Sequence, residues 1–167
     1  LVAHQAIVPI HCWPYWSGAG KYGNHLDDPY TRLTAGMAAL VRSLGQAPQK
    51  PIWLQEFGVS SQEMPEADIP IWLEKAVMSA IGQGVSWFTW WASHDVDQRF
   101  KFHPFEYDLG LLTTNNQLKP QGQLFKEIAN AYRGKPVVIP ATSTPPPAEH
   151  NEQGTWRWLL DWMGSSN

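Results

Sequence analysis

The chain has 167 residues, enough for one ordinary domain, and 43% of them are hydrophobic, which is typical of a globular protein. Its formal net charge of −3 argues against nucleic acid as the main partner, because no excess of basic residues is available to contact phosphates. No apolar run approaches the roughly 20 residues of a membrane-spanning helix, and the single cysteine, Cys12, leaves no internal disulfide.

The first predicted strand covers residues 6–11 and ends at His11. Pro9 predicts a bulge or an irregular pairing within it, because proline has no N–H for the strand ladder. After a polar, glycine-rich loop, Asp28 and Pro29 predict the start of a helix. Gly45 is expected to end that helix. Its apolar face consists of Leu33, Met37, Leu40, Val41 and Leu44.

The second predicted strand covers residues 52–56 and ends in Glu56. A loop leads from it to a helix that Pro70 opens. The third predicted strand covers residues 85–91 and is apolar on both faces, as in a parallel sheet that is covered by helices. Gly82 and Gly84 end the helix before this strand. Its apolar face consists of Trp72, Leu73, Ala76, Val77, Ala80 and Ile81.

A loop over residues 92–118 follows the third strand, and loops of this length are often functional. After one more helix, five of the 14 prolines lie within residues 134–155, which predicts a linker between a domain at 1–133 and a tail at 156–167. The tail is expected to dock on the domain, to begin a truncated segment, or to lie on a membrane surface. Its single cation disfavours the last of these. Its helical apolar face consists of Trp156, Leu159, Leu160 and Met163.

Strand and helix therefore alternate three times, at about 40 residues per unit, which predicts a parallel α/β fold. The chain starts with Leu1 rather than Met and carries no signal peptide, so we expect it to begin within a domain. Its localisation is unknown from the sequence, and both secretion and a periplasmic location are compatible with it.

Glu56 is the residue that most needs an explanation, because a carboxylate that ends an apolar strand is costly to bury. One explanation is an ion pair with a nearby Arg or Lys, or exposure to solvent. The other is catalysis at the mouth of a barrel, as a nucleophile or a general acid/base. His11 is likewise either a core histidine bonded to the backbone or a site residue. The ten tryptophans are typical of carbohydrate-handling proteins, because sugar rings stack on indole.

The strand ending in His11, the QEFG sequence around Glu56 and the Trp90–Trp91 pair occur in an order that resembles the clan A retaining glycoside hydrolases. These are the (β/α)8 TIM barrels that include the cellulase-like family 5. The resemblance covers about residues 6–133 and implies the βα units of strands 6–8, followed here by the proline-rich linker and the short tail. Two further motifs before the last helix belong to the resemblance: Leu109–Gly110–Leu111 and Lys119–Pro120.

The resemblance implies that Glu56 is the nucleophile of a retaining β-glycosidase. It also implies that His11 and a tyrosine hydrogen-bond to this nucleophile. Trp13 stands at the family's tyrosine position, so Tyr15 is expected to reach in from the turn.

The resemblance further implies that a tryptophan at the end of the last strand forms the floor of the sugar subsite. Because neighbouring residues of a regular strand point to opposite faces, we expect Trp90 to face the sugar and Trp91 to lie in the core or at the rim. Trp13 and Trp16 are expected either to stack on sugar or to pack at the rim. Trp53 and Trp87 are expected to pack against the helices.

The chain departs from the family in lacking the acid/base, which is a Glu after an Asn at the end of strand four. Its only Asn-Glu pair, Asn151–Glu152, lies in the predicted linker. A complete barrel takes about 250 residues, so we expect the C-terminal part of a longer enzyme whose missing N-terminal half is a partner of this chain. The expected substrate is an oligo- or polysaccharide of the β-glucan or β-mannan type. The alternatives are a non-catalytic carbohydrate-binding protein on the same scaffold and a degenerate fragment with a structural or interaction role.

The loop after the third strand offers further polar candidates. His94 and Asp95, with Asp97, are expected to hydrogen-bond sugar hydroxyls, to hold Ca²⁺, or to lie in a solvated loop. An Asp-x-Asp pair alone predicts no metal site, and the implied chemistry needs no cofactor. The remaining loop carboxylates are Glu63, Glu66 and Glu106, of which Glu106 is the one rival partner for Glu56.

Overall fold

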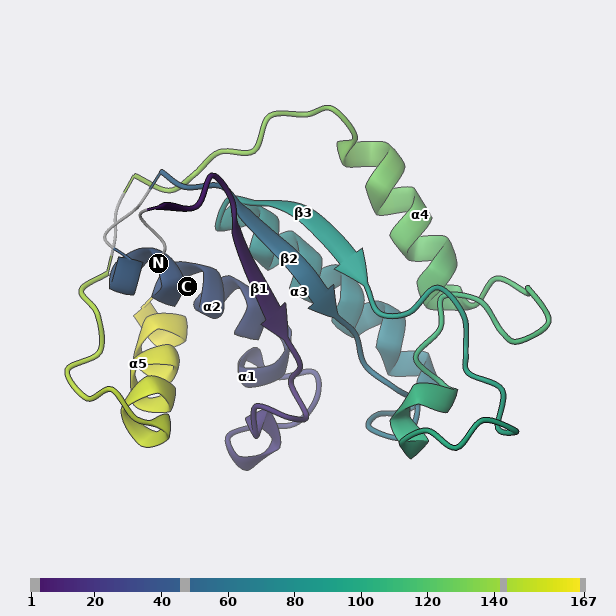
Figure 1. The fold of residues 1–167 in the computed structure, drawn as a ribbon. Coiled ribbons are helices and arrows are strands. Elements are labelled where there is room, and N and C mark those ends of the chain that lie inside the picture. The colour runs from purple at the N-terminus through teal and green to yellow at the C-terminus, as the bar shows by residue number, and fades with distance from the viewer. Residues whose placement is uncertain (1–3, 46–48, 142–143, 166–167) are drawn as a thin grey trace.

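The computed structural model describes residues 4–45, 49–141 and 144–165. Its sheet has three parallel strands in the order β1, β2, β3: Val8–Cys12, Ile52–Phe57 and Val85–Trp90 (Figure 1). The predicted parallel α/β arrangement is confirmed. Part of the loop that leads into β2 (46–48), of the proline-rich segment (142–143) and of the tail (166–167) lies outside the described residues.

Five α-helices are present within the described ranges: α1 Asp28–Thr31, α2 Leu33–Gly45, α3 Ile69–Gly82, α4 Pro120–Tyr132 and α5 Glu152–Ser165. Short 3-10 turns lie at Ala19–Lys21, Glu66–Asp68 and Pro104–Tyr107. The helix that the sequence predicts from Asp28 to Gly45 is two helices, because the backbone leaves the helical region at Arg32. Its N-cap is Asp27 rather than Asp28.

The hydrophobic core lies between one face of the sheet and the helices α2 and α3, which cover it (Figure 1). Burial alternates along β1, where Val8, Ile10 and Cys12 are buried and the residues between them are exposed. Trp72 of α3 is almost fully buried here and its Nε1 donates to the Tyr30 carbonyl oxygen at 3.1 Å. This packing fixes the strands against a rigid layer, so their ends are held in defined positions. The remaining buried side chains of the strands and of α2 and α3 include Leu33, Ala38, Ile52, Leu54, Phe57, Leu73, Val77, Ala80 and Val85.

The second strand carries a bulge next to Glu56. Leu54 pairs with Ile10 and Glu56 with His11, so Gln55 has no counterpart in β1. A regular strand would place Glu56 on the same core-facing side as Leu54. The extra residue instead turns Glu56 away from the core, and its side chain is 30% exposed. Bulges often re-aim a side chain next to an active site.

The opposite face of the sheet carries no helix in the part of the chain that the structure describes (Figure 1). Trp87 is 48% exposed there, and Trp53 beside it donates from Nε1 to Thr89 Oγ1 at 2.9 Å. The expectation that Trp53 packs against the helices is therefore wrong, while Trp87 is half-exposed and lines a groove that α3 and α4 also line. An irregular register between β2 and β3 places Trp53 opposite Trp87, on the face away from the core.

The long loop after β3 is held by a largely buried ion pair. Lys119 Nζ lies 2.9 Å from Asp95 Oδ1, and the two side chains are only 8% and 12% exposed. Asp95 Oδ1 also accepts from the Gly110 N–H at 2.7 Å, and Lys119 donates to the Asp108 carbonyl oxygen at 3.1 Å. A Cβ at residue 110 would lie 2.1 Å from the Asp95 backbone nitrogen, so only glycine fits. Gly110 of the Leu-Gly-Leu motif and Lys119 of the Lys-Pro motif therefore stabilise the conformation of this loop.

The tail docks on the domain as helix α5, which is one of the expected outcomes. It begins at Glu152, four residues earlier than the sequence suggested. Helix α5 lies next to α2 (Figure 1). Trp156 Nε1 donates to the Ser17 carbonyl oxygen at 3.0 Å, and a Cβ at Gly36 of α2 would lie 2.7 Å from Leu159. The buried face of α5 consists of Gly154, Trp156, Leu159, Trp162 and Met163. Within the described ranges, no helix is long and apolar enough to cross a membrane.

Candidate active site

A cleft of about 220 Å³ lies where the three strands end. The carboxyl ends of parallel strands meet at one edge of a sheet, so residues far apart in the sequence converge there. Tryptophans, other aromatic residues and three carboxyl groups dominate its walls, which come from the segments after β1, β2 and β3. The lining residues are Trp13, Tyr15, Trp16, Glu56, Ser60, Glu63, Trp91, His103, Phe105, Glu106 and Leu109.

Glu56 stands at the end of β2 beside His11 of β1, as the sequence predicts. His11 Nδ1 lies 3.2 Å from Glu56 Oε2, and His11 Nε2 lies 3.0 Å from Gln55 Oε1. Both partners are acceptors as placed, so an imidazolium satisfies them together. A neutral ring does so only if the Gln55 amide is reversed and its NH₂ donates. In either case the ring can donate an N–H to Glu56 Oε2, which accepts it.

The tryptophan that faces the cleft is Trp91, in contrast to the preference for Trp90. Trp90 is 6% exposed, and its Nε1 donates to the Leu109 carbonyl oxygen at 2.7 Å within the core. Its ring packs edge-on against Phe57 at 5.2 Å. Trp91 is 42% exposed, lines the cleft, and donates from Nε1 to Glu106 Oε2 at 3.2 Å. The irregular pairing of β3 with β2 decides which of the two neighbours turns inward.

Gly58 explains why a glycine follows Glu56 and Phe57. A Cβ at this position would lie 2.7 Å from the Trp91 carbonyl oxygen and 3.4 Å from the Trp13 ring. The Trp91 N–H also donates to the Phe57 carbonyl oxygen at 2.9 Å. The missing side chain therefore lets two cleft tryptophans approach the end of β2.

One wall of the cleft is an aromatic cluster that joins the segment after β1 to the loop after β3. Tyr15 packs edge-on against Phe105 with ring centroids 4.4 Å apart, and Trp16 packs against His103 at 5.2 Å. Among the described residues, no hydrogen bond joins the Tyr15 hydroxyl to Glu56. Trp13, Tyr15 and Trp16 all line the cleft. The contributions of His103 and Phe105 had no sequence signal, because they come from a loop without periodicity.

His94 and Asp95 do not line the cleft. His94 is exposed and its Nε2 lies 2.9 Å from Asn116 Oδ1, while Asp95 is held by Lys119. The loop turns Asp95 back toward the start of α4, which gives it a folding role. Asp97 forms an exposed ion pair with Arg99 at 2.7 Å, and the Arg99 guanidinium lowers the pKa of its carboxyl. Over the described residues, no group of three or more His, Cys, Asp or Glu side chains is arranged to hold a metal ion.

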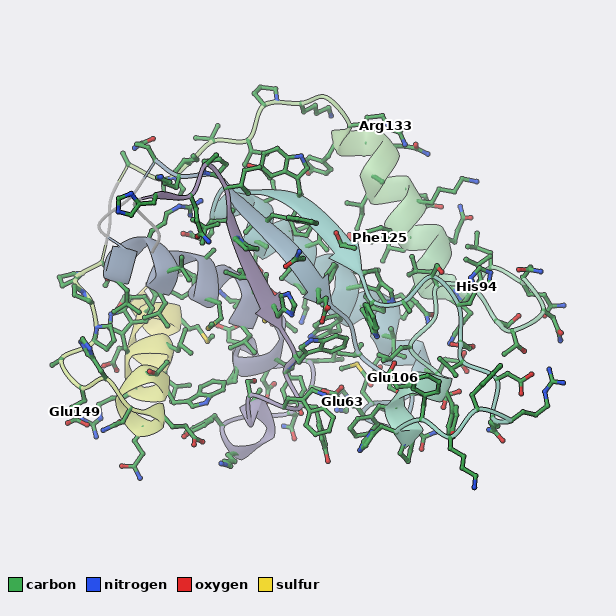
Figure 2. The ribbon with its side chains drawn as sticks, in the orientation of Figure 1. Glu63, His94, Glu106, Phe125, Arg133 and Glu149 are labelled. Carbon is green, nitrogen blue, oxygen red and sulfur yellow. The ribbon has the colours of Figure 1, made fainter. Side chains whose placement is uncertain are left out.

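Glu63 is a cleft residue that the sequence placed only among loop carboxylates. It lies in the segment after β2, and Figure 2 shows it at the same end of the sheet as Glu106. Burial raises the pKa of its carboxyl from the usual 4.5 to about 7. The Ser60 and Tyr15 backbone N–H groups lower this pKa, but their effect is smaller than that of burial. Nothing in the sequence signals this burial, because tertiary packing of the walls creates it.

The raised pKa of Glu63 predicts that the protein loses stability as the pH rises from about 4.5 to about 7. In this window the folded state retains a proton that the unfolded state has released, so the stabilisation is complete below it and lost above it. The full effect is on the order of 3 kcal/mol, at about 1.4 kcal/mol per pKa unit. Urea unfolding across this range should show a smaller loss for Glu63→Gln than for the wild type or for exposed Glu66→Gln. Equal slopes in all three would contradict the prediction.

The comparisons with known proteins point in one direction. No family model and no curated protein matches the chain. Among solved structures, a GH5_18 variant from Bifidobacterium longum subsp. longum in complex with Manβ1-4GlcNAc is 30% identical over 82% of this chain, with a TM-score of 0.75. A GH5_18 variant from Streptomyces cattleya in complex with the same disaccharide is 25% identical over 95% of this chain, with a TM-score of 0.73. A further GH5_18 structure from Bifidobacterium longum subsp. longum, 24% identical over 96% of this chain with a TM-score of 0.77, shows the fold alone.

The chain spans 33%, 41% and 42% of the length of these three structures. The matched proteins are glycoside hydrolases of the TIM-barrel clan, which supports a glycosidase and does not favour the non-catalytic alternatives. The parallel α/β fold of this chain matches one part of the barrel in these GH5_18 glycoside hydrolases.

Proposed function

We propose that the chain carries the nucleophile side of the active site of a retaining β-glycosidase, with Glu56 as the nucleophile. The observation that carries the proposal is the position of Glu56 at the end of a parallel strand. It lines an aromatic cleft there, with His11 Nδ1 3.2 Å from its Oε2. This arrangement supplies an ionisable nucleophile, a hydrogen-bond donor and indole faces for a sugar ring.

In this reaction a Glu56 carboxylate oxygen attacks the anomeric carbon, and the bond from that carbon to the leaving oxygen breaks. A second carboxyl group, about 5–5.5 Å away, gives its proton to the leaving oxygen. It then takes a proton from the water that hydrolyses the glycosyl ester and frees Glu56. We assign this acid/base role to a residue outside the chain, in the N-terminal half of the barrel.

The substrate class that we propose is a β-mannoside with a short aglycone, such as Manβ1-4GlcNAc. The support is that this disaccharide occupies two of the similar solved structures, at 30% and 25% identity. The cleft volume of about 220 Å³ lies below the roughly 300–1,000 Å³ of sites for drug-sized ligands. The share of the site that this chain contributes therefore suits about one sugar ring, with Trp91 as its proposed platform.

The bare face and the free edges of the sheet support a missing barrel half as a partner. A groove of about 1,080 Å³ runs along β3, α3 and α4 and includes Trp87, Phe88 and Phe125. Unpaired strand edges and exposed tryptophans of this kind need cover in a stable protein. We propose that upstream strands and helices of the same barrel supply it.

Covalent trapping tests the assignment of Glu56. The native polypeptide that contains this chain is treated with 2-deoxy-2-fluoro-β-mannosyl fluoride. Attack at the anomeric carbon expels fluoride, and the fluorine at C2 slows hydrolysis of the resulting ester. We expect tandem mass spectrometry to find the fluorosugar on Glu56, and no adduct in Glu56→Gln. An adduct on another residue would overturn the assignment, and no adduct at all would count against a retaining mannosidase.

A further inference from the structure

Glu63 has an unusual position in the cleft. It lies in the segment that follows β2, at the same end of the sheet as Glu106 (Figure 2). The cleft that it lines is also lined by Glu56 and Trp91. Glu63 Oε1 is enclosed by protein and unpaired among the described residues, and the Ser60 and Tyr15 backbone N–H groups face the carboxyl. A ligand in the cleft can therefore meet only the other carboxyl oxygen of this cleft-lining residue.

The backbone segment that carries Glu63 is held in place. The Glu63 N–H donates to the Ser60 carbonyl oxygen at 2.9 Å. The neighbouring Gln62 donates from Nε2 to Asp108 Oδ2 at 2.7 Å, which ties this wall to the loop after β3. The residue after it, Met64, is 2% exposed and anchors the segment in the core. The polar group is therefore presented to the cleft by a braced segment.

A sugar hydroxyl suits this position better than a charged ligand group. A hydroxyl both donates and accepts, so it satisfies Glu63 whether the carboxyl is ionised or protonated. Burial raises the pKa of Glu63 to about 7, so below that pH the neutral form predominates and the cleft that Glu56 also lines carries one negative charge fewer. Indole and phenyl rings line the same cleft and offer faces on which the C–H groups of a sugar ring can stack.

We propose that Glu63 binds one ring hydroxyl of the mannoside held beside Glu56. The proposal rests on the proposed function. It makes Glu63 a substrate-binding residue that fixes the orientation of the ring, while Trp91 supplies the stacking face. Glu66, which is exposed and lies outside the cleft lining, has no such role and serves as the matched control.

The test uses the native polypeptide in the Glu56→Gln background, which keeps the sugar intact during the measurement. Calorimetry gives the Kd of methyl β-D-mannopyranoside and of its monodeoxy analogues, each lacking one hydroxyl. We expect Glu63→Ala to weaken binding of the parent sugar about tenfold or more. Glu63→Gln, which keeps a donor and an acceptor, should restore most of the affinity, and Glu66→Ala should leave Kd unchanged.

The analogues separate a direct contact from a structural effect. If Glu63 contacts one hydroxyl, the analogue that lacks this hydroxyl should bind Glu56→Gln as weakly as the parent sugar binds Glu56→Gln/Glu63→Ala. The double variant has already lost the contact, so it should bind the parent sugar and this analogue with the same Kd. A loss that is the same for every analogue, or a Kd of Glu56→Gln/Glu63→Ala within twofold of Glu56→Gln, would overturn the proposal for Glu63 alone. No binding by Glu56→Gln itself would overturn the proposed function and this proposal together.

Discussion

Replacing Glu56 with Gln is expected to lower kcat/KM for an aryl β-mannoside by roughly 10⁴-fold or more, the range in which loss of a covalent nucleophile lies in other hydrolases. The amide keeps the size of the side chain and its contact with His11 but cannot form the glycosyl ester. Because Glu56 is 30% exposed and its neighbours remain satisfied, the free energy of unfolding should change by less than about 1 kcal/mol. Steady-state kinetics and urea unfolding of the native polypeptide measure the two effects.

The control for this variant is Glu66→Gln, which removes an exposed carboxyl from the same loop region and should leave kcat/KM unchanged. A second variant, Glu56→Ala, distinguishes the nucleophile from the acid/base. With azide present, the anion should attack the anomeric carbon from the vacated side, expel the aryloxide and yield the inverted α-mannosyl azide. Formation of the β-azide would instead assign Glu56 as the acid/base, and undiminished turnover would remove it from the mechanism.

Replacing Lys119 with Ala is expected to destabilise the protein by about 3–5 kcal/mol, because it leaves the Asp95 carboxylate uncompensated in a site that is only 12% exposed. The loop after β3 carries His103, Phe105 and Glu106 into the cleft, so activity should fall along with stability. Total stability of a domain is about 5–15 kcal/mol, so an effect of this size is readily seen in urea unfolding.

Two further variants identify the cause of that loss. Replacing both partners, in Asp95→Asn/Lys119→Met, removes the unpaired charge and should recover much of the stability. Lys101→Ala removes an exposed lysine of the same loop and should have an effect within about 0.5 kcal/mol. If Lys119→Ala were as stable as Lys101→Ala, the ion pair would have no part in folding the loop.

The elements of the fold were predictable because they rest on local patterns. Apolar runs marked the three strands, and the spacing of apolar residues together with Pro29, Pro70 and Pro120 marked the helices. Boundaries shifted by one or two residues at the strands, and the break at Arg32 was not foreseen. A short break costs one turn of helix and leaves the periodicity on either side almost unchanged, so the sequence carries no clear signal for it.

The site was predictable only in part. Glu56 and His11 were found because residues that end neighbouring parallel strands must meet, whatever the details of packing. Trp91, by contrast, replaced Trp90 because an irregular register shifts the side chains of β3, and two adjacent tryptophans give no sequence clue to that shift. Asp95 has the polarity of a sugar ligand, yet its partner Lys119 lies 24 positions away, where only the folded loop brings the two charges together.

The sequence by itself determined the order of strands and helices, the parallel sheet and the carboxylate at the end of its middle strand, since these follow from periodicity and chain connectivity. Tertiary structure decided which way the side chains at the strand ends point. The bulge at Gln55 turned Glu56 out of the core, and the packing of two loops buried Glu63 in the cleft. One extra residue in a strand reverses the side of every residue that follows it, and desolvation depends on neighbours from the whole chain, so neither effect can be seen in a local pattern.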